Sequence, residues 1–148
     1  MNAFQYLNVR VGCPNFNKRK SSMQIIINVI DNKDQRYPTI GDWNLSTDKS
    51  ALYIYVSHLG NWKYESLIAI HETIEALLCY EREITGEVVD EFDKQYEVKR
   101  AKNDESEPGD DPHAPYRKEH FFATNIERLL AAELGVDWKK YEETIGKL

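Results

Sequence analysis

Cysteine is scarce in this sequence of 148 residues, where Cys13 and Cys79 are the only two. They are far apart along the chain and form no CxxC pair, so the sequence indicates neither a disulfide framework nor a cysteine-based zinc knuckle. We expect two reduced thiols, with Cys79 as a small buried residue on a helix.

Long apolar runs are also missing. No stretch of about 18 apolar residues occurs, so we predict no membrane-spanning segment and no membrane partner. The start of the chain, MNAFQYLNVRVGCPNF, lacks the charged residues and apolar run of a secretory signal. We therefore expect a cytoplasmic protein.

The sequence also lacks a broad surplus of basic residues. The formal net charge is −6, and residues 87–111 account for all of it with ten acidic and four basic side chains. The short basic cluster NKRK at 17–20 is typical of a solvated turn. Because phosphate neutralisation needs a broad basic face, we predict no nucleic-acid partner.

The composition that is present, 41% hydrophobic and 30% charged, is typical of a globular protein. We predict a single domain over 1–148 whose first part, 1–61, is rich in β-structure. Strands are predicted from β-branched and aromatic residues at 4–11, 23–31, 42–45 and 51–57. The last two flank the turn STDKS as a hairpin, in which Leu52, Ile54 and Val56 share one face and Tyr53, Tyr55 and Ser57 the other.

The second part, 62–148, has helical periodicity. Helices are predicted at 63–85 and 119–134, each ended by the glycine that follows, Gly86 and Gly135, and a more polar helix at 87–102. Loop 103–118 carries three prolines, and Asp137 is a natural N-cap for a short last helix. Strands first and helices afterwards predict an α+β fold: a small N-terminal antiparallel or mixed sheet followed by three to four helices.

The stretch IAIHETIEALL (68–78) holds a histidine and a glutamate four residues apart. At 100° per residue, Leu67, Ile74 and Leu78 lie about 20–60° to one side of His71, and Glu75 lies about 40° to the other. His71 and Glu75 therefore project side by side from within the apolar stripe of their helix.

The helix predicted at 119–134 repeats this pattern. Glu127 lies about 20° from His120 around the helix axis, among Ala123, Leu130 and Leu134. Each of the two helices thus directs one imidazole and one carboxylate toward the core. A buried carboxylate without a partner costs several kcal/mol, so these groups need partners.

One divalent cation would satisfy these side chains together. His71 and Glu75 offer a nitrogen and an oxygen, and His120, with Glu127 as the next candidate, would complete a set of three ligands that leaves one position for water. Zinc is the metal that we expect. Glu72, at about 100° from His71, is displaced from the ligands, as a general base that activates water would be.

Ordinary pairing is the alternative to a metal. His71 and Glu75 could form an imidazole–carboxylate pair on one helix. His120 and Glu127 could pair with Arg82, Lys118 or Arg128.

Loop 103–118 leads directly into the helix of His120 and holds further candidates. Asp111 and His113 could supply a ligand or line the mouth of a site, although the composition of the loop favours a surface turn. Tyr116 could orient a bound ligand.

The segment AIHETIEALL resembles the active helix of the zincin metallopeptidases, which carries HExxH and follows a β-sheet. The resemblance implies a zincin-like fold, a zinc ligand at His71 and a general base at Glu72. This sequence departs from HExxH at position 75, where Glu75 replaces the second histidine and lowers the net positive charge of a bound metal site. His120, or Glu127 as in the branch with a downstream glutamate, would then be the third ligand.

The segment 107–138 is similar to small uncharacterised proteins encoded in bacteriophage and prophage genomes. This resemblance implies a setting in a bacterial cytoplasm or a phage-infected cell. It implies no activity.

Three functions are compatible with these patterns. The first is a divalent-metal-binding, zincin-like protein that acts as a peptidase-like hydrolase on an unknown substrate. The second is a non-catalytic phage or accessory protein, in which a metal or a buried His/Glu network braces the helices while the surface binds a partner. The third is a Mg²⁺-dependent nucleotide hydrolase that uses Glu72, Glu75 and the acids of 87–93, but Mg²⁺ prefers oxygen ligands to imidazole.

Overall fold

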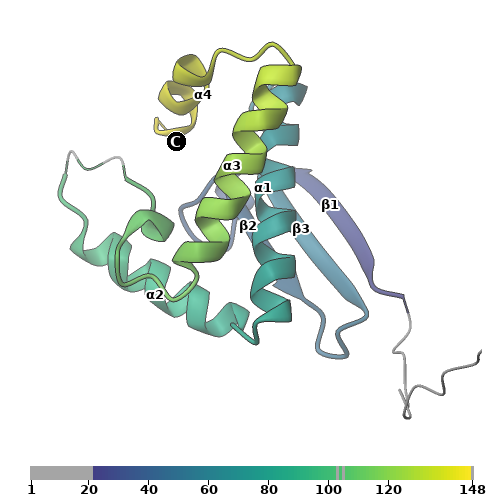
Figure 1. Cartoon of the computed structure of the whole chain (residues 1–148). Coiled ribbons are helices and arrows are strands. Elements are labelled where there is room, and N and C mark those ends of the chain that lie inside the picture. The colour runs from purple at the N-terminus through teal and green to yellow at the C-terminus, as the bar shows by residue number, and fades with distance from the viewer. Residues whose placement is uncertain (1–21, 103, 105, 148) are drawn as a thin grey trace, which may run out of the picture.

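The computed structural model describes residues 22–102, 104 and 106–147. Within them a three-stranded sheet precedes four α-helices, which confirms the predicted α+β class with an N-terminal sheet (Figure 1). The strand predicted at 4–11 and Cys13 lie outside the described residues. No helix of the described part is long and apolar enough to cross a membrane.

The sheet consists of β1 (Gln24–Ile30), β2 (Gly41–Leu45) and β3 (Ala51–Ser57) in the order β1-β3-β2. β3 pairs antiparallel with β2, as predicted for the hairpin, and parallel with β1, so the sheet is mixed. Because side chains alternate along a strand, Leu52, Ile54 and Val56 point together into the core, where each is buried.

Ser57 shows why the opposite face of β3 is not simply exposed. Its hydroxyl donates to Asn32 Oδ1 at 2.9 Å and accepts from Gln35 Nε2 at 3.1 Å. The segment between β1 and β2, which includes the turn η1 (Asn32–Asp34), therefore covers this end of the strand. Ser57 is completely buried as a result.

Four helices follow the sheet: α1 (Trp62–Glu81), α2 (Gly86–Lys99), α3 (Arg117–Glu133) and α4 (Trp138–Ile145). A short 3-10 turn, η2 (Pro108–Asp110), lies between α2 and α3. Figure 1 shows α1 between the sheet and α3. Because α1 packs against the sheet on one side and α3 on the other, its buried residues, such as Leu67, Ala69 and Ala76, are spread widely around the helix axis.

The end predicted for the first long helix is wrong. α1 stops at Glu81, and Glu83 then adopts a φ of 60°, in the left-handed region that ends a helix. Gly86 is instead the first residue of α2, which ends at Lys99 rather than at 102. Gly135, with a φ of 63°, does follow the end of α3 as predicted.

Contacts at both ends hold α1 and α3 side by side in opposite directions. Near the start of α1, Lys63 Nζ donates to the carbonyl oxygen of Leu134 at 2.6 Å, just after α3. Just after the end of α1, Arg82 forms an ion pair with Glu119 in the first turn of α3. The two helices that carry the predicted ligands therefore face each other.

Candidate metal centre

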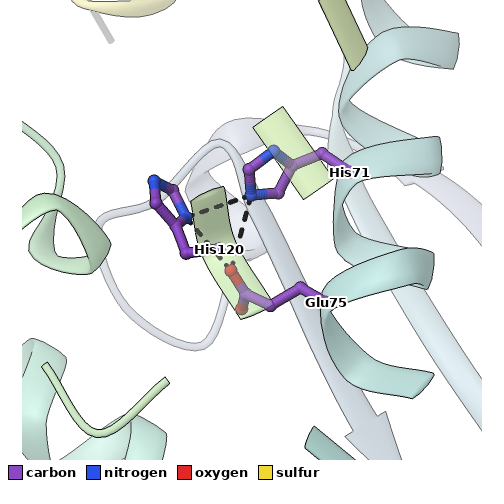
Figure 2. Close-up of side chains that lie close together, drawn as sticks. All are labelled: His71, Glu75 and His120. Carbon is purple, nitrogen blue, oxygen red and sulfur yellow. Dashed lines mark hydrogen bonds and ion pairs between the residues drawn. The ribbon is translucent and has the colours of Figure 1, made fainter. Parts of the chain in front are cut away.

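Three of the predicted ligands meet at one point between α1 and α3 (Figure 2). His71 Nε2 lies 3.4 Å from Glu75 Oε2 and 3.2 Å from His120 Nδ1. His120 Nδ1 lies 3.1 Å from the same oxygen of Glu75. All three side chains are buried, so they form a closed triangle of one oxygen and two nitrogens.

The size of this triangle fits a small tetrahedral ion. Zinc binds nitrogen and oxygen ligands at about 2.0–2.1 Å, which separates neighbouring ligand atoms by roughly 3.3 Å in a tetrahedron. The three edges measured here, 3.1, 3.2 and 3.4 Å, lie around that value. The donors could therefore occupy three corners of a tetrahedron, as in sites that leave the fourth corner for water.

Each histidine has a carboxylate on its other ring nitrogen. Glu127 Oε2 lies 2.9 Å from His71 Nδ1, and Glu107 Oε2 lies 3.2 Å from His120 Nε2. In metal sites such outer carboxylates fix the tautomer and the orientation of the imidazole. Glu127, predicted as a possible ligand, therefore lies behind His71 rather than on the triangle.

The carboxylates are themselves oriented by aromatic donors. Trp43 Nε1 donates to Glu75 Oε1 at 3.2 Å, which leaves Oε2 for the two histidines. The hydroxyl of Tyr141 donates to Glu127 Oε1, which leaves Oε2 for His71. The sheet and α4 thus both contribute to the arrangement of the cluster.

One pair of histidine tautomers would leave a place for a proton or a metal ion in the triangle. When His71 Nδ1 and His120 Nε2 carry the protons that they donate to the outer carboxylates, the inner nitrogens present only lone pairs. These two lone pairs then face each other and the Glu75 oxygen. Without a proton or a metal ion between them, the three acceptors would repel one another.

In the metal-free cluster the neighbouring carboxylates favour protonated histidines, which would place a proton between the three atoms. Burial would lower the pKa of His120, but its hydrogen bonds to Glu107 and Glu75 raise it to about 9. Burial would likewise lower the pKa of His71, and Glu127 and Glu75 raise it well above its usual value instead. Burial would raise the pKa of Glu75, but the two histidines lower it to about 2. A metal ion would take the place of protons on these histidines.

Glu72, the predicted general base, lies beside the cluster with its side chain against β2. A Cβ atom on Gly41 would come within 2.3 Å of Glu72 Oε1, so the glutamate occupies the space that the glycine leaves. Burial and the nearby charge of Glu75 raise the pKa of Glu72 well above its usual value. Among the described residues, no hydrogen bond or ion pair engages its carboxyl group.

The candidates in loop 103–118 lie apart from the triangle. Asp111 and His113 contact each other in a turn, where His113 is mostly exposed. Tyr116 is buried and donates a hydrogen bond to Asp93 Oδ1 of α2 at 2.5 Å, while its ring lies nearly perpendicular to that of His120. Tyr116 therefore packs behind His120 and joins α2 to the start of α3.

Of the ordinary pairs considered as the alternative to a metal, His71–Glu75 is present at 3.4 Å, whereas within the described residues no arginine or lysine pairs with His120 or Glu127. Arg82 pairs with Glu119 and Arg128 with Glu142, while His120 and Glu127 contact the other members of the cluster.

Two shallow surface hollows lie along α2 and share Phe92, Gln95 and His113 as lining residues. Neither hollow is lined by a residue of the triangle.

Three residues of the site were not found by sequence reasoning: Trp43, Glu107 and Tyr141. Trp43 and Tyr141 resemble ordinary aromatic core residues, and no periodicity distinguishes their polar atoms. Glu107 stands in an acidic loop where several carboxylates look alike. The one available signal was its position directly before Pro108-Gly109, a turn that leads back toward the helix of His120.

Comparisons with known proteins give no match: no family model, no curated protein and no solved structure matches this chain. The geometry of the cluster is therefore the basis for assigning a function to this protein.

Proposed function

We propose that this protein binds one divalent metal ion, most favourably zinc, and acts as a metal-dependent hydrolase of the zincin-like kind. The ligands are His71 Nε2, Glu75 Oε2 and His120 Nδ1. The observation that carries the proposal is the buried triangle of these three atoms, whose edges of 3.1–3.4 Å suit a tetrahedral ion.

Residues around this ion would have two roles, positioning of the ligands and transfer of a proton. A divalent ion held there would supply Lewis acidity and lower the pKa of water to near 7. Trp43 and Glu127 hold Glu75 and His71 in position. Glu72 accepts a proton from the attacking water and returns it to the leaving group, and its position beside the ligand pair on α1 supports this role.

Glu75 makes this site different from an HExxH site. A carboxylate ligand in place of a second neighbouring histidine cancels part of the metal charge, and the outer carboxylates Glu107 and Glu127 add further negative charge. An anionic environment weakens the Lewis acidity of the ion. We therefore propose hydrolysis in the broad sense, with a peptidase-like reaction as one form of it and the substrate unassigned.

A second candidate function is supported by the burial of the cluster. His71, Glu75 and His120 are nearly inaccessible, and the two hollows along α2 lie away from them. In this alternative the metal braces α1 against α3 and the protein is a non-catalytic phage or accessory protein that binds a partner. A cytoplasmic setting, in a bacterium or a phage-infected cell, belongs to both proposals.

A Mg²⁺-dependent nucleotide hydrolase has less support. Two of the three converging atoms are imidazole nitrogens, whereas Mg²⁺ prefers oxygen. Two of the acids of α2 that such a site would need are engaged elsewhere, since Asp90 pairs with Arg36 and Asp93 accepts from Tyr116.

Metal analysis of the full chain, purified without a metal-affinity step, tests the proposal. We expect close to one equivalent of zinc, or uptake of one equivalent of Zn²⁺ or Co²⁺ on titration. Less than a tenth of an equivalent, with no uptake, would reject the metal site. Glu72→Gln then separates the two candidates: an enzyme retains the metal and loses its hydrolysis of a peptide and ester panel, whereas a structural site retains the metal and shows no hydrolysis in either protein.

A further inference from the structure

Glu107 contacts His120 on the side of the ring that faces away from the triangle. We propose that Glu107 is a positioning residue that keeps the proton of His120 on Nε2 and thereby makes Nδ1 the metal-binding nitrogen. This inference rests on the proposed metal site, and it assigns a role to a segment outside the HExxE helix.

The geometry excludes Glu107 as a fourth ligand of the same ion. Its Oε2 atom lies 3.2 Å from His120 Nε2, while Nδ1 of the same ring points at Glu75. The two nitrogens lie on different edges of the imidazole, so the ring separates Glu107 from the triangle. Accepting a hydrogen bond is the role left to this carboxylate.

The backbone next to Glu107 is shaped to lie against the ring of His120. A Cβ atom on Gly109 would come within 2.3 Å of His120 Cγ and 2.6 Å of Nδ1. The turn η2 can therefore approach the imidazole only because residue 109 has no side chain. Asp110 Oδ1 is the next carboxylate atom, at 3.7 Å from Nε2, beyond hydrogen-bond distance.

Contacts with α2 and with Arg100, the residue directly after it, anchor the segment just before Glu107. Arg100 Nη2 donates to the carbonyl oxygen of Ser106 at 2.7 Å, and the hydroxyl of Tyr96 contacts Ser106 Oγ. With Ser106 held by α2 and Gly109 against the ring, Glu107 has a defined position between them. Contacts on both sides of Glu107 thus hold its carboxylate near His120.

The two histidines would consequently bind the ion in different ways. Glu127 contacts Nδ1 of His71, so Nε2 of that ring would bind the metal. Glu107 contacts Nε2 of His120, so Nδ1 of that ring would bind it. The side chain of Glu107 is also 46% exposed, while that of Glu127 is 7% exposed. Glu107 can therefore be replaced without opening the core, which makes the inference testable.

The experiment uses the full chain with Zn²⁺ as the probe. Long-range ¹H–¹⁵N NMR spectra of the zinc-loaded protein should show His120 protonated at Nε2 and zinc-bound at Nδ1, and His71 with the opposite assignment. Glu107→Gln removes the charge at nearly constant shape and should weaken zinc binding about 10- to 100-fold in a chelator competition. It should also weaken or exchange-broaden the Nε2–H signal of His120.

Asp110→Asn is the matched control, because it removes a carboxylate of the same turn that is too far away for a hydrogen bond. We expect its zinc affinity within about threefold of wild type, the change of a loosely coupled surface charge. Zinc bound through Nε2 of His120, or Glu107→Gln with wild-type affinity and an unchanged Nε2–H signal, would overturn the inference while leaving the metal site intact. A wild-type protein that binds no zinc would instead overturn the proposed function.

Discussion

The structure contains two histidine–carboxylate contacts with the same separation and very different surroundings. His120 Nδ1 lies 3.1 Å from Glu75, and His113 Nδ1 lies 3.1 Å from Asp111. The side chain of His120 is 6% exposed, whereas that of His113 is 89% exposed. Distance alone therefore does not distinguish a candidate ligand from an ordinary surface pair.

The difference lies in the number of partners and in access to water. Water screens the exposed pair, which contributes at most about 1 kcal/mol to stability. In the buried cluster His71, Glu75, His120 and Glu127 are shielded from bulk solvent and depend on one another, so removal of one member leaves the rest with uncompensated charge. Substitutions in the buried cluster should therefore have larger effects than matched substitutions at the surface.

Replacement of His120 should have the largest effect. His120→Ala removes one corner of the triangle, and we expect zinc affinity to fall by more than about 100-fold, because outer partners alone contribute about 10- to 100-fold. His113→Ala should bind zinc as wild type does. Chelator competition measures both, with circular dichroism to verify folding; equal affinities for the two variants would place the third ligand elsewhere.

A methyl group at position 109 should disturb the buried cluster through shape alone. Gly109→Ala places a Cβ within 2.3 Å of the His120 ring, so we expect a loss of roughly 1–3 kcal/mol in the free energy of unfolding and weaker zinc binding.

Gly86→Ala is the control for this substitution. Its Cβ would meet Trp43 at an ordinary 3.4 Å at the start of α2, where alanine favours the helix. Urea unfolding should show Gly86→Ala as neutral or slightly stabilised. A Gly109→Ala protein as stable as Gly86→Ala would mean that the turn η2 does not press on the ring.

Removal of one hydroxyl tests whether α4 supports the cluster. Tyr141→Phe deletes the donor to Glu127 Oε1 and leaves a buried acceptor unsatisfied, at a cost of about 1–3 kcal/mol. Tyr53→Phe, on the less buried face of β3, is the matched control and should change stability by less than about 0.5 kcal/mol. Thermal unfolding distinguishes them, and similar melting temperatures would argue against this contact.

Asp93 shows what burial does to a carboxyl group that forms no ion pair with another of the described residues. Burial, opposed by the hydrogen bond from Tyr116, raises the pKa of Asp93 to about 7, whereas the histidines lower that of Glu75 to about 2. The unfolded chain releases the Asp93 proton near pH 3.8, so the folded state binds more protons between about pH 4 and 7. Its contribution to stability is therefore complete below this window and is lost as the pH rises through it.

Asp93→Asn should remove this decline. Compared with wild type, its free energy of unfolding should fall less steeply from pH 4.5 to 7, by up to roughly 1 kcal/mol per pH unit. Urea unfolding of the metal-free proteins at several pH values measures the difference, with the surface variant Asp111→Asn as control. Parallel curves for Asp93→Asn and wild type would show that Asp93 ionises normally in the fold.

Much of the site was predictable because it lies on helices. The angular positions of His71 and Glu75, and of His120 and Glu127, follow from 3.6 residues per turn, and all four side chains are buried as predicted. The hairpin of β2 and β3 followed from alternation and a polar turn. The end of α1 was not predictable in this way. The left-handed residue that follows it is Glu83, and a glutamate does not mark the end of a helix as a glycine does.

The sequence by itself determined which groups must be buried and on which helix faces, because periodicity and the cost of burying charge are local properties. Only the tertiary structure decided that His71, Glu75 and His120 share one point and that Glu127 lies behind His71. It also decided that Glu107, from a loop, faces His120. These contacts depend on how α1 packs against α3 and on how closely the turn at Gly109 can approach His120. The spacing of residues along one helix predicts neither.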